Sequence, residues 1–323
     1  MLLSMGKTKK EQKLKELHKN LLERWQAMVH KFTVEFPESI WKAIQDKKGA
    51  GSIKDFLVRL IEKEFELRKN KVLILAGGEG ARLKPLTETI PKAMIPVGYR
   101  PLLEYNLELI AKSGITDIVL LIGKLGNRIM KHFGQKWNGL DISYVSESTN
   151  LDTAGAIYNA RNLVSDTFIV MNSDILTDIN LVSLIDYHKN HKKDVIATVC
   201  GIGVNDYYQT MGKTADKGLF SDYGVFYIDD VINKLVTRFE EPPTKSQQSG
   251  YINTGIYVFE PQIMDYLSDS EGKSISGDTL PHLINDNKVK AYLCPKNVFW
   301  IDVAHPERWS KAWDVLFSGA FKI

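Results

Sequence analysis

The stretch KVLILAGGEGARLKPLTETIPKAMIPVG, residues 71–98, decides the fold. It begins with a short run of branched apolar residues, which is typical of a buried strand, and it turns at once into a glycine-rich segment. Gly77, Gly78 and Gly80 fall within four consecutive positions. Because glycine has no Cβ, the backbone N–H groups of such a turn can approach a phosphate closely. The stretch therefore predicts a strand that ends in an anion-binding loop.

Short apolar runs recur further along the chain, and segments with helical spacing separate them. The runs are TDIVLLIG at 116–123, LDISYV at 140–145, TFIVMN at 167–172 and DVIATV at 194–199. This alternation predicts an α/β fold with a doubly wound, mainly parallel sheet that helices cover on both faces. Ligands of such sheets bind beyond the carboxyl ends of the strands. The sequence contains no hexapeptide repeat, so we expect no C-terminal β-helix.

Composition excludes several classes of protein. The 323 residues are 44% hydrophobic and 25% charged, as in globular proteins, and 42 Lys and Arg nearly balance 39 Asp and Glu. Cys200 and Cys294 are too few for a disulfide framework and have no metal-ligand spacing. No run approaches the roughly 18 apolar residues of a membrane span, and Met1–Met5 is too short for a signal-peptide core. We expect a cytoplasmic protein with at least two domains.

Residues 1–70 differ from the rest of the chain. They carry 16 basic and 10 acidic side chains, a balance of +6, against −3 for residues 71–323. Their pattern predicts an amphipathic helix over 9–30, a strand over 31–36 and two further helices, the second beginning after Ser52. We therefore place a domain boundary at residue 70, between this module and a body of residues 71–323.

The strand and the two helices after it resemble the ribbon-helix-helix fold, in which two chains pair their strands. One strand and two short helices cannot bury a core alone, so we expect a homo-oligomer that forms through residues 1–70. In that family the polar face of the ribbon enters the DNA major groove. Here this face offers Lys31, Thr33 and Glu35, and phosphates would repel the glutamate. Dimerisation without DNA binding is favoured, and DNA binding is the alternative.

Two cations follow the glycine turn. Arg82 lies within it and Lys92 comes directly after Pro91. A planar guanidinium and a compact ammonium near one loop can neutralise a polyphosphate together. The turn is not a Walker loop, because no Gly-Lys-Ser/Thr follows it, and it is not a dinucleotide fingerprint, because Leu83 replaces the third glycine.

The whole string resembles the signature of the sugar-1-phosphate nucleotidylyltransferases, and the likeness extends from about residue 71 to 313. The resemblance implies a Rossmann-like nucleotidyltransferase fold that transfers a nucleotidyl group from a nucleoside triphosphate to a sugar 1-phosphate, releasing pyrophosphate. It also implies that Ala76 and the three loop glycines bind the nucleotide, and that Arg82 and Lys92 contact its phosphates. Ala81 stands where the family usually has threonine.

Two aspartates end apolar runs. Asp174 follows TFIVMNS, and Asp302 lies in VFWIDVAHPERW. Such a carboxylate is costly unless it is capped, paired or bound to metal. Each aspartate alone is better explained as a helix cap, and a phosphate loop in the same chain shifts the balance toward metal binding. Mg²⁺ takes one or two protein carboxylates together with phosphate oxygens and water. The resemblance implies that Asp174 and Asp302 hold Mg²⁺.

The segment YVSESTNLDTAGAI resembles the part of the family that recognises the base, where Gly155 allows a close approach. It also contains Glu147, where many uridylyl and thymidylyl enzymes have glutamine. An ionised carboxylate only accepts hydrogen bonds, which suits the adjacent N1–H and N2–H₂ donors of guanine. GTP is therefore favoured, with mannose 1-phosphate or a related manno-sugar as acceptor. Uridylyl or thymidylyl transfer to glucose 1-phosphate stays open, and Glu147 as a solvent-facing strand residue is the alternative role.

By the same resemblance, Gly224, Glu240 and Asn253 bind the sugar. Glu241 replaces the family lysine that holds the sugar phosphate, so Arg238 or Lys245 substitutes for it, or acceptor binding is weak, or the domain no longer catalyses. The last possibility is a DNA-binding regulator whose body senses a nucleotide sugar. Because the attacking phosphate oxygen is already anionic, no general base is needed, and we assign none of the seven histidines.

Overall fold

The computed structural model describes residues 38–47, 52–147, 151–193, 195–211, 223–241, 250–267 and 272–321. The chain divides into two compact units, residues 1–61 and 62–323. Helix α2 spans Glu38–Lys47, and α3, which spans Ile53–Arg68, contains the division. The Ser52 carbonyl accepts the Phe56 N–H at 3.0 Å, so α3 begins where the sequence predicts. The predicted helix at 9–30 and strand at 31–36 lie outside the described residues, and the ribbon-helix-helix module stays a prediction.

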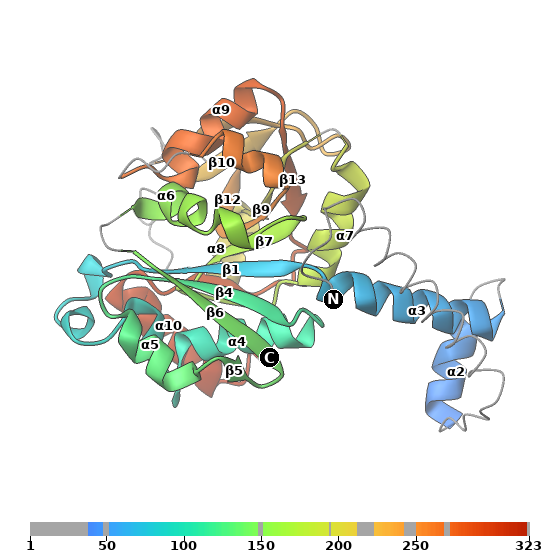
Figure 1. Cartoon of the computed structure of the whole chain (residues 1–323), viewed down its shortest axis with the longest axis horizontal. Helices are drawn as coiled ribbons and strands as arrows, with labels where there is room; N and C mark the ends of the chain where they lie inside the picture. The colour runs from blue at the N-terminus through green and yellow to red at the C-terminus, as the bar shows by residue number, and fades with distance from the viewer. Residues whose placement is uncertain are drawn as a thin grey trace, which may run out of the picture. The chain divides into compact units, whose positions relative to one another are not determined.

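The second unit is built on a ten-stranded mixed sheet with the strand order β11-β10-β12-β7-β1-β4-β6-β5, in which β9 pairs with β12 and β13 pairs with β9 (Figure 1). Its centre, β7-β1-β4-β6, is parallel, whereas β12 runs antiparallel to β7. The strands are β1 Lys71–Ala76, β4 Asp117–Ile122, β5 Lys136–Trp137, β6 Leu140–Ser146, β7 Phe168–Asn172, β9 Ala197–Gly203, β10 Val225–Ile228, β11 Val236–Glu240, β12 Tyr251–Phe259 and β13 Val289–Leu293.

Helices cover both faces of this sheet. Figure 1 shows α4, α5 and α10 on one face and α6 and α9 on the other. The helices of this unit are α4 Leu102–Lys112, α5 Gly126–Phe133, α6 Asp152–Asn159, α7 Leu181–His191, α8 Val204–Met211, α9 Leu280–Asn285 and α10 Pro306–Phe317. The predicted doubly wound α/β fold is confirmed, and the described residues contain no β-helix.

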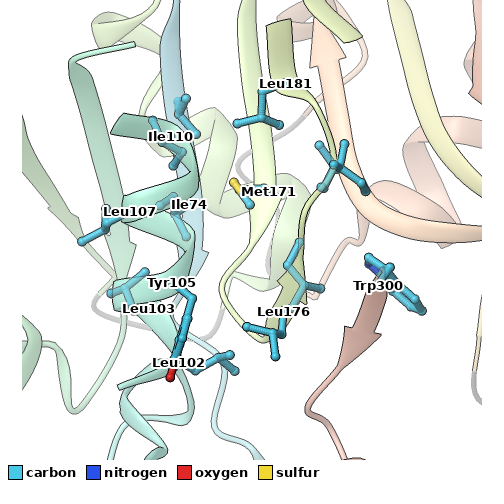
Figure 2. Close-up of a cluster of buried hydrophobic side chains, with 14 of the residues drawn as sticks. Ile74, Leu102, Leu103, Tyr105, Leu107, Ile110, Met171, Leu176, Leu181 and Trp300 are labelled. Atoms are coloured by element: carbon cyan, nitrogen blue, oxygen red, sulfur yellow. The ribbon is translucent and has the colours of Figure 1, made fainter. Parts of the chain in front are cut away.

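Alternation along β1 explains why two cores form. Val72 and Ile74 point into the cluster that contains the apolar side of α4, and Figure 2 shows Ile74 beside Leu107 and Ile110. Leu73, between them, belongs to a second cluster on the α6 and α9 side. Both faces of a central parallel strand must be apolar in such a fold. This accounts for the unbroken run of apolar residues in the sequence.

Two short ladders lie outside the main sheet. β8, Ile175–Thr177, pairs antiparallel with β14, Trp300–Asp302, in a register that sets Ile175 opposite Asp302. β2, Pro96–Val97, pairs with β3, Arg100–Pro101. Among the described helices, none combines the length and the apolar character needed to cross a membrane.

Removing a large side chain from the centre of the sheet tests this description of the core. Phe168 on β7 is fully buried, so Phe168→Ala is expected to lower the free energy of unfolding by about 3–5 kcal/mol. Leu163 is 39% exposed, and Leu163→Ala should change it by no more than about 0.5 kcal/mol. Urea denaturation measures both. Equal losses in the two variants would contradict the assignment of Phe168 to the core.

Candidate functional site

The loop after β1 is shaped by Gly80, which has a φ of +63°. The Thr87 hydroxyl donates to the Gly80 carbonyl at 2.8 Å. A Cβ at Gly80 would lie 2.7 Å from Thr87 Cγ2 and 3.1 Å from Lys92 Cβ. Only glycine fits both the backbone angle and this space. The loop thus folds back so that Arg82, in a short 3₁₀ turn, and Lys92 come to the same side.

A cavity of about 380 Å³ opens beside this loop and gathers most of the predicted nucleotide-binding residues. Its lining includes Gly77, Gly78, Gly80, Arg82, Lys92 and Glu147. Ala76 instead lines a neighbouring hollow of about 250 Å³, which Gly77, Gly78 and Lys92 also line. Gly155 is buried within α6, where Thr153 and Ala156, rather than Gly155 itself, line the first cavity.

Glu147 follows β6 directly and lines this cavity. Its backbone N–H donates to the Ile122 carbonyl at 3.0 Å, and its Oε2 accepts the Leu151 N–H at 3.3 Å. A Cβ at Gly77 would come within 2.9 Å of Glu147 Oε1, so the carboxyl group lies against the glycine loop. Burial, helped by the nearby charge of Asp152, raises the pKa of Glu147 despite the Leu151 hydrogen bond. The side chain is therefore half-buried at the cavity and is not a solvent-facing strand residue.

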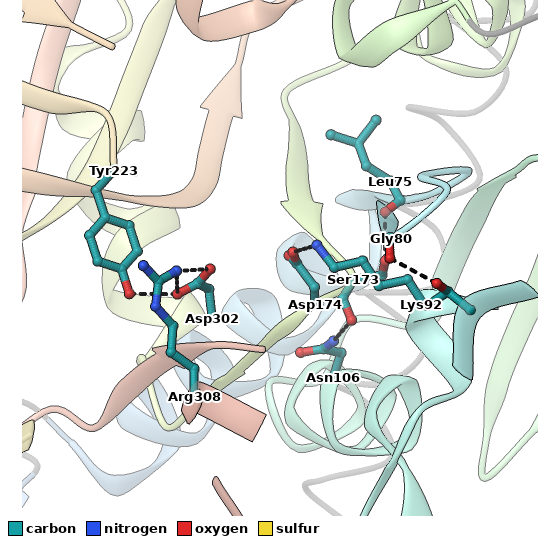
Figure 3. A network of polar contacts seen from close by, with 10 residues as sticks. Leu75, Gly80, Lys92, Asn106, Ser173, Asp174, Tyr223, Asp302 and Arg308 are labelled. Atoms are coloured by element: carbon teal, nitrogen blue, oxygen red, sulfur yellow. Dashed lines mark hydrogen bonds and ion pairs between the residues drawn. The ribbon is translucent and has the colours of Figure 1, made fainter. Parts of the chain in front are cut away.

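Asp174 lies in the turn between β7 and β8, which hydrogen bonds fix in place. The Ser173 hydroxyl donates to the Leu75 carbonyl at 2.7 Å, and the Asn106 side chain donates to the Ser173 carbonyl at 3.1 Å. Asp174 Oδ2 forms an ion pair with Lys92 Nζ (Figure 3). The ion pair joins the glycine loop to the end of β7.

Asp302 lies beside Asp174 because β14 pairs with β8. The Val303 N–H donates to the Asp174 carbonyl at 2.6 Å. Arg308 Nη1 lies 2.8 and 2.7 Å from the two carboxylate oxygens of Asp302, and the Tyr223 hydroxyl donates to Oδ1 at 2.6 Å (Figure 3). Burial raises the pKa of the Asp302 carboxyl group; Arg308 opposes this shift and Asp174 adds to it.

Sequence reasoning missed Arg308 and Tyr223. Arg308 is only 2% exposed although it lies among the polar residues of an amphipathic helix. The available signal was its position: Pro306 begins α10 soon after Asp302, so a long side chain in the first helical turn can return to the strand end. Tyr223 carries no comparable signal, because its contact with Asp302 spans 79 residues.

A second cavity, of about 450 Å³, adjoins the first, and Asp152 and Thr153 line both. Asp174, Asp302 and Tyr223 line it, as do the predicted sugar-binding residues Gly224 and Asn253. Among its described lining residues there is no lysine or arginine, whereas Arg82 and Lys92 line the first cavity. The two cations thus line the first cavity, where Glu79, Glu147 and Asp152 also lie, whereas the described wall of the second cavity has carboxylates without a cation.

Of the two neighbouring glutamates, Glu240 does not line the second cavity as the resemblance implies, whereas Glu241 does. Glu240 is absent from the described lining of the second cavity, and its Oε1 pairs with Arg238 Nε at 3.3 Å. Glu241 lines the cavity instead. Successive residues of a strand point to opposite faces, so a strand end cannot present both. Arg238, which also stacks on Tyr227, does not line the cavity either, and Lys245 lies outside the described residues.

The two aspartates suit a hard divalent cation. Both line one cavity, and the charge of Asp174 adds to the rise in the pKa of Asp302 that burial causes. Among the described residues, no group of three or more His, Cys, Asp or Glu side chains could hold a metal ion. Two carboxylates suffice for Mg²⁺ when substrate phosphates and water complete its octahedron. The residues present therefore fit Mg²⁺ shared with a phosphate ligand better than a metal held by protein alone.

Comparison with known families and proteins gives concordant results. The family model described as nucleotidyl transferase matches residues 71–315. The UTP–glucose-1-phosphate uridylyltransferase of Synechocystis is 33% identical over 261 residues, covering 76% of this chain and 63% of that protein. The mannose-1-phosphate guanyltransferase of Saccharomyces cerevisiae is 32% identical over 245 residues, covering 73% and 62%. The chain thus spans less than two thirds of the length of these relatives.

Solved structures show the same fold. HddC from Yersinia pseudotuberculosis, crystallised in complex with GMP-PN, aligns with a TM-score of 0.59 and 27% identity, covering 76% of this chain and 99% of that one. A UDP-glucose pyrophosphorylase crystallised with UDP-glucose aligns with a TM-score of 0.65 and 19% identity, covering 77% and 99%. The second likeness concerns the fold alone.

Two neighbouring glycines provide a matched test of the loop. Gly80→Ala is expected to lower the free energy of unfolding by at least about 1 kcal/mol, because alanine is strained at positive φ and its Cβ would meet Thr87 and Lys92. A Cβ at Gly78 has no neighbour within 4 Å, so Gly78→Ala should change it by no more than about 0.5 kcal/mol. Thermal denaturation compares the two variants. Equal stability would show that the loop does not require the left-handed turn.

Proposed function

Because the chain belongs to the nucleotidyl transferase family, we propose that it transfers a nucleotidyl group from a nucleoside triphosphate to a sugar 1-phosphate, giving a nucleotide sugar and pyrophosphate. One observation carries this proposal. A cavity with a glycine loop and two cations adjoins a cavity lined by polar side chains, and two carboxylates lie at the second. Two anionic reactants placed in these hollows would meet end to end.

The proposed reaction requires alignment of the reactants and neutralisation of their charges, and it does not require a general base. The acceptor phosphate oxygen attacks the α-phosphorus and is already an anion, so the barrier lies in bringing two polyanions together. Arg82 and Lys92 neutralise the phosphates of the nucleotide from the loop side. Asp174 and Asp302 would hold Mg²⁺, which when bound offsets the negative charge that builds on the phosphate oxygens. Lys92 pairs with Asp174 here, so it lies between the loop and the proposed metal site.

We propose GTP as the nucleotide. The half-buried carboxylate of Glu147 against Gly77 can accept from two adjacent donors of guanine and from no comparable pair on uracil or thymine. The guanyltransferase name of one relative and the GMP-PN complex of HddC support this choice. The uridylyltransferase name of the other relative favours UTP, which is the alternative.

A manno-configured sugar 1-phosphate is the proposed acceptor, recognised by the second cavity. Asn253 lies there with its side-chain N–H bonded to Tyr257 at 2.6 Å, and its backbone N–H donates to the Gly224 carbonyl at 2.9 Å. Glu241 on the same wall would repel a dianionic phosphate, so we place the sugar ring, and not its phosphate, near Glu241.

We propose further that residues 71–323 form the catalytic domain and that residues 1–70 hold copies of the chain together. The competing function is a DNA-binding regulator that senses a nucleotide sugar without turning it over. It predicts salt-sensitive binding to duplex DNA and no pyrophosphate release. Deleting residues 1–70 separates the two ideas, since only the dimerisation model predicts a smaller assembly that keeps its activity.

Asp174→Asn tests the proposed metal site. This variant should fold normally and lose at least about a hundredfold in the rate of pyrophosphate release, since a metal ion supplies several kcal/mol of charge stabilisation in such transfers. Asp141→Asn is the matched control, because Asp141 forms a surface pair with Lys136 at 3.0 Å. Release should be followed with Mg²⁺, GTP and mannose 1-phosphate. A near-normal rate in Asp174→Asn would remove Asp174 from the site.

Glu147→Gln tests base recognition and its pH dependence. Because burial raises the pKa of Glu147, lowering the pH should protonate it earlier than an exposed glutamate, and the KM for GTP should rise. Glutamine does not titrate, so the KM of the Glu147→Gln variant for GTP should not vary in this pH range. Glutamine also offers both a donor and an acceptor. The variant should lose roughly tenfold to a hundredfold of its preference for GTP over UTP, as expected for charged hydrogen bonds. An unchanged preference for GTP over UTP would show that Glu147 does not recognise the base.

A further inference from the structure

Arg308 is a buried cation to which the proposed reaction assigns no role. It lies in the first turn of α10 and is 2% exposed, and it is absent from the described lining of both cavities. A buried charge is costly unless a partner compensates it, and here the partner is Asp302. Arg308 therefore does not face a substrate in either hollow, and the contact through which it can act on the proposed metal site is the one with Asp302.

The guanidinium is held on two sides. Its Nη1 lies 2.8 Å from Oδ1 and 2.7 Å from Oδ2 of Asp302, and its Cζ stacks 4.2 Å from the centre of the Tyr223 ring. The hydroxyl of the same tyrosine donates to Asp302 Oδ1 at 2.6 Å and lies 2.8 Å from the Tyr207 hydroxyl. Arg308 and Tyr223 thus hold the carboxylate in one orientation, as Figure 3 shows.

The donors are distributed unequally between the two carboxylate oxygens. A carboxylate oxygen can accept two hydrogen bonds. Within the described residues, Oδ1 accepts from both Tyr223 and Arg308, whereas Oδ2 accepts from Arg308 alone. One lone pair, on Oδ2, is left for a further ligand.

We propose that Arg308 and Tyr223 are positioning residues that turn Asp302 so that it binds the divalent cation through Oδ2 only. This inference rests on the proposed function, because it takes Asp174 and Asp302 as the metal ligands. Partners of this kind, which orient a metal ligand without touching the metal, typically change metal affinity by 10-fold to 100-fold. The competing explanation is that the ion pair only fastens α10 to β14.

Binding of Mn²⁺ alone to the full chain separates the two explanations, with free Mn²⁺ measured by electron paramagnetic resonance. Arg308→Lys keeps the charge but loses the geometry of the guanidinium, and Tyr223→Phe keeps the ring but loses the hydroxyl. Both should weaken Mn²⁺ binding by about tenfold or more. Excess Mg²⁺ should restore much of their pyrophosphate release, which a purely structural defect would not allow.

Arg100→Lys is the matched control. Arg100 bonds Glu108 at 2.8 Å and stacks 4.3 Å from the centre of the Tyr105 ring, so its partners are of the same kind, a carboxylate and a tyrosine ring, but lie away from the two aspartates. Mn²⁺ affinity in this variant should equal that of the wild type. Should Arg308→Lys fail to fold, Tyr223→Phe decides the question by itself.

Unchanged or tighter Mn²⁺ binding in folded Tyr223→Phe and Arg308→Lys would overturn the inference. A wild-type chain that releases pyrophosphate but binds no Mn²⁺, even with a non-hydrolysable GTP analogue present to complete the site, would overturn it as well, while leaving the proposed function standing. A wild-type chain that binds Mn²⁺ at these aspartates but releases no pyrophosphate with any nucleotide would instead overturn the proposed function.

Discussion

Two carboxylates lie side by side at the edge of an apolar core, and each has its own cation. The register of β8 against β14 sets Asp302 opposite Ile175, one residue from Asp174. Neighbouring buried carboxylates repel each other, which is why Asp174 adds to the raised pKa of Asp302. Lys92 compensates Asp174 and Arg308 compensates Asp302. The glycine loop, β7, β14 and α10 are held together at this one point.

The described lysine and arginine side chains divide the site into one region with cations and one without. The cavity beside the loop has Arg82 and Lys92 in its wall together with Glu79, Glu147 and Asp152, whereas the described wall of the adjoining cavity has acidic and aromatic side chains and amides but no lysine or arginine. A nucleotide with its phosphates suits the first region, and a ligand that presents hydroxyl groups suits the second. The acceptor phosphate must then lie between them, near Asp174 and Asp302, where a divalent cation would offset its charge.

The fold and the phosphate side of this site could be predicted from sequence because they depend on local patterns. The run at 71–76 and its glycines specify strand and loop, and both aspartates end apolar runs. Tyr223 could not be predicted in this way, since its contact with Asp302 spans 79 residues. Arg308 offered one local signal, its place in the first turn of a helix that begins soon after Asp302. The position of Glu240 away from the second cavity could not be predicted for a related reason: which side chain at this strand end faces the cavity is set by the pairing of β11 with β10.

A crystal structure of the full chain with Mg²⁺ and a non-hydrolysable GTP analogue tests the central claim most directly. The account predicts the phosphates on the amides of Gly77–Gly80, Lys92 moved from Asp174 to a phosphate oxygen, and one Mg²⁺ bound by Asp174 and by Oδ2 of Asp302. Density for the phosphates outside the cavity of Arg82 and Lys92, or an ion bound by neither aspartate, would contradict it.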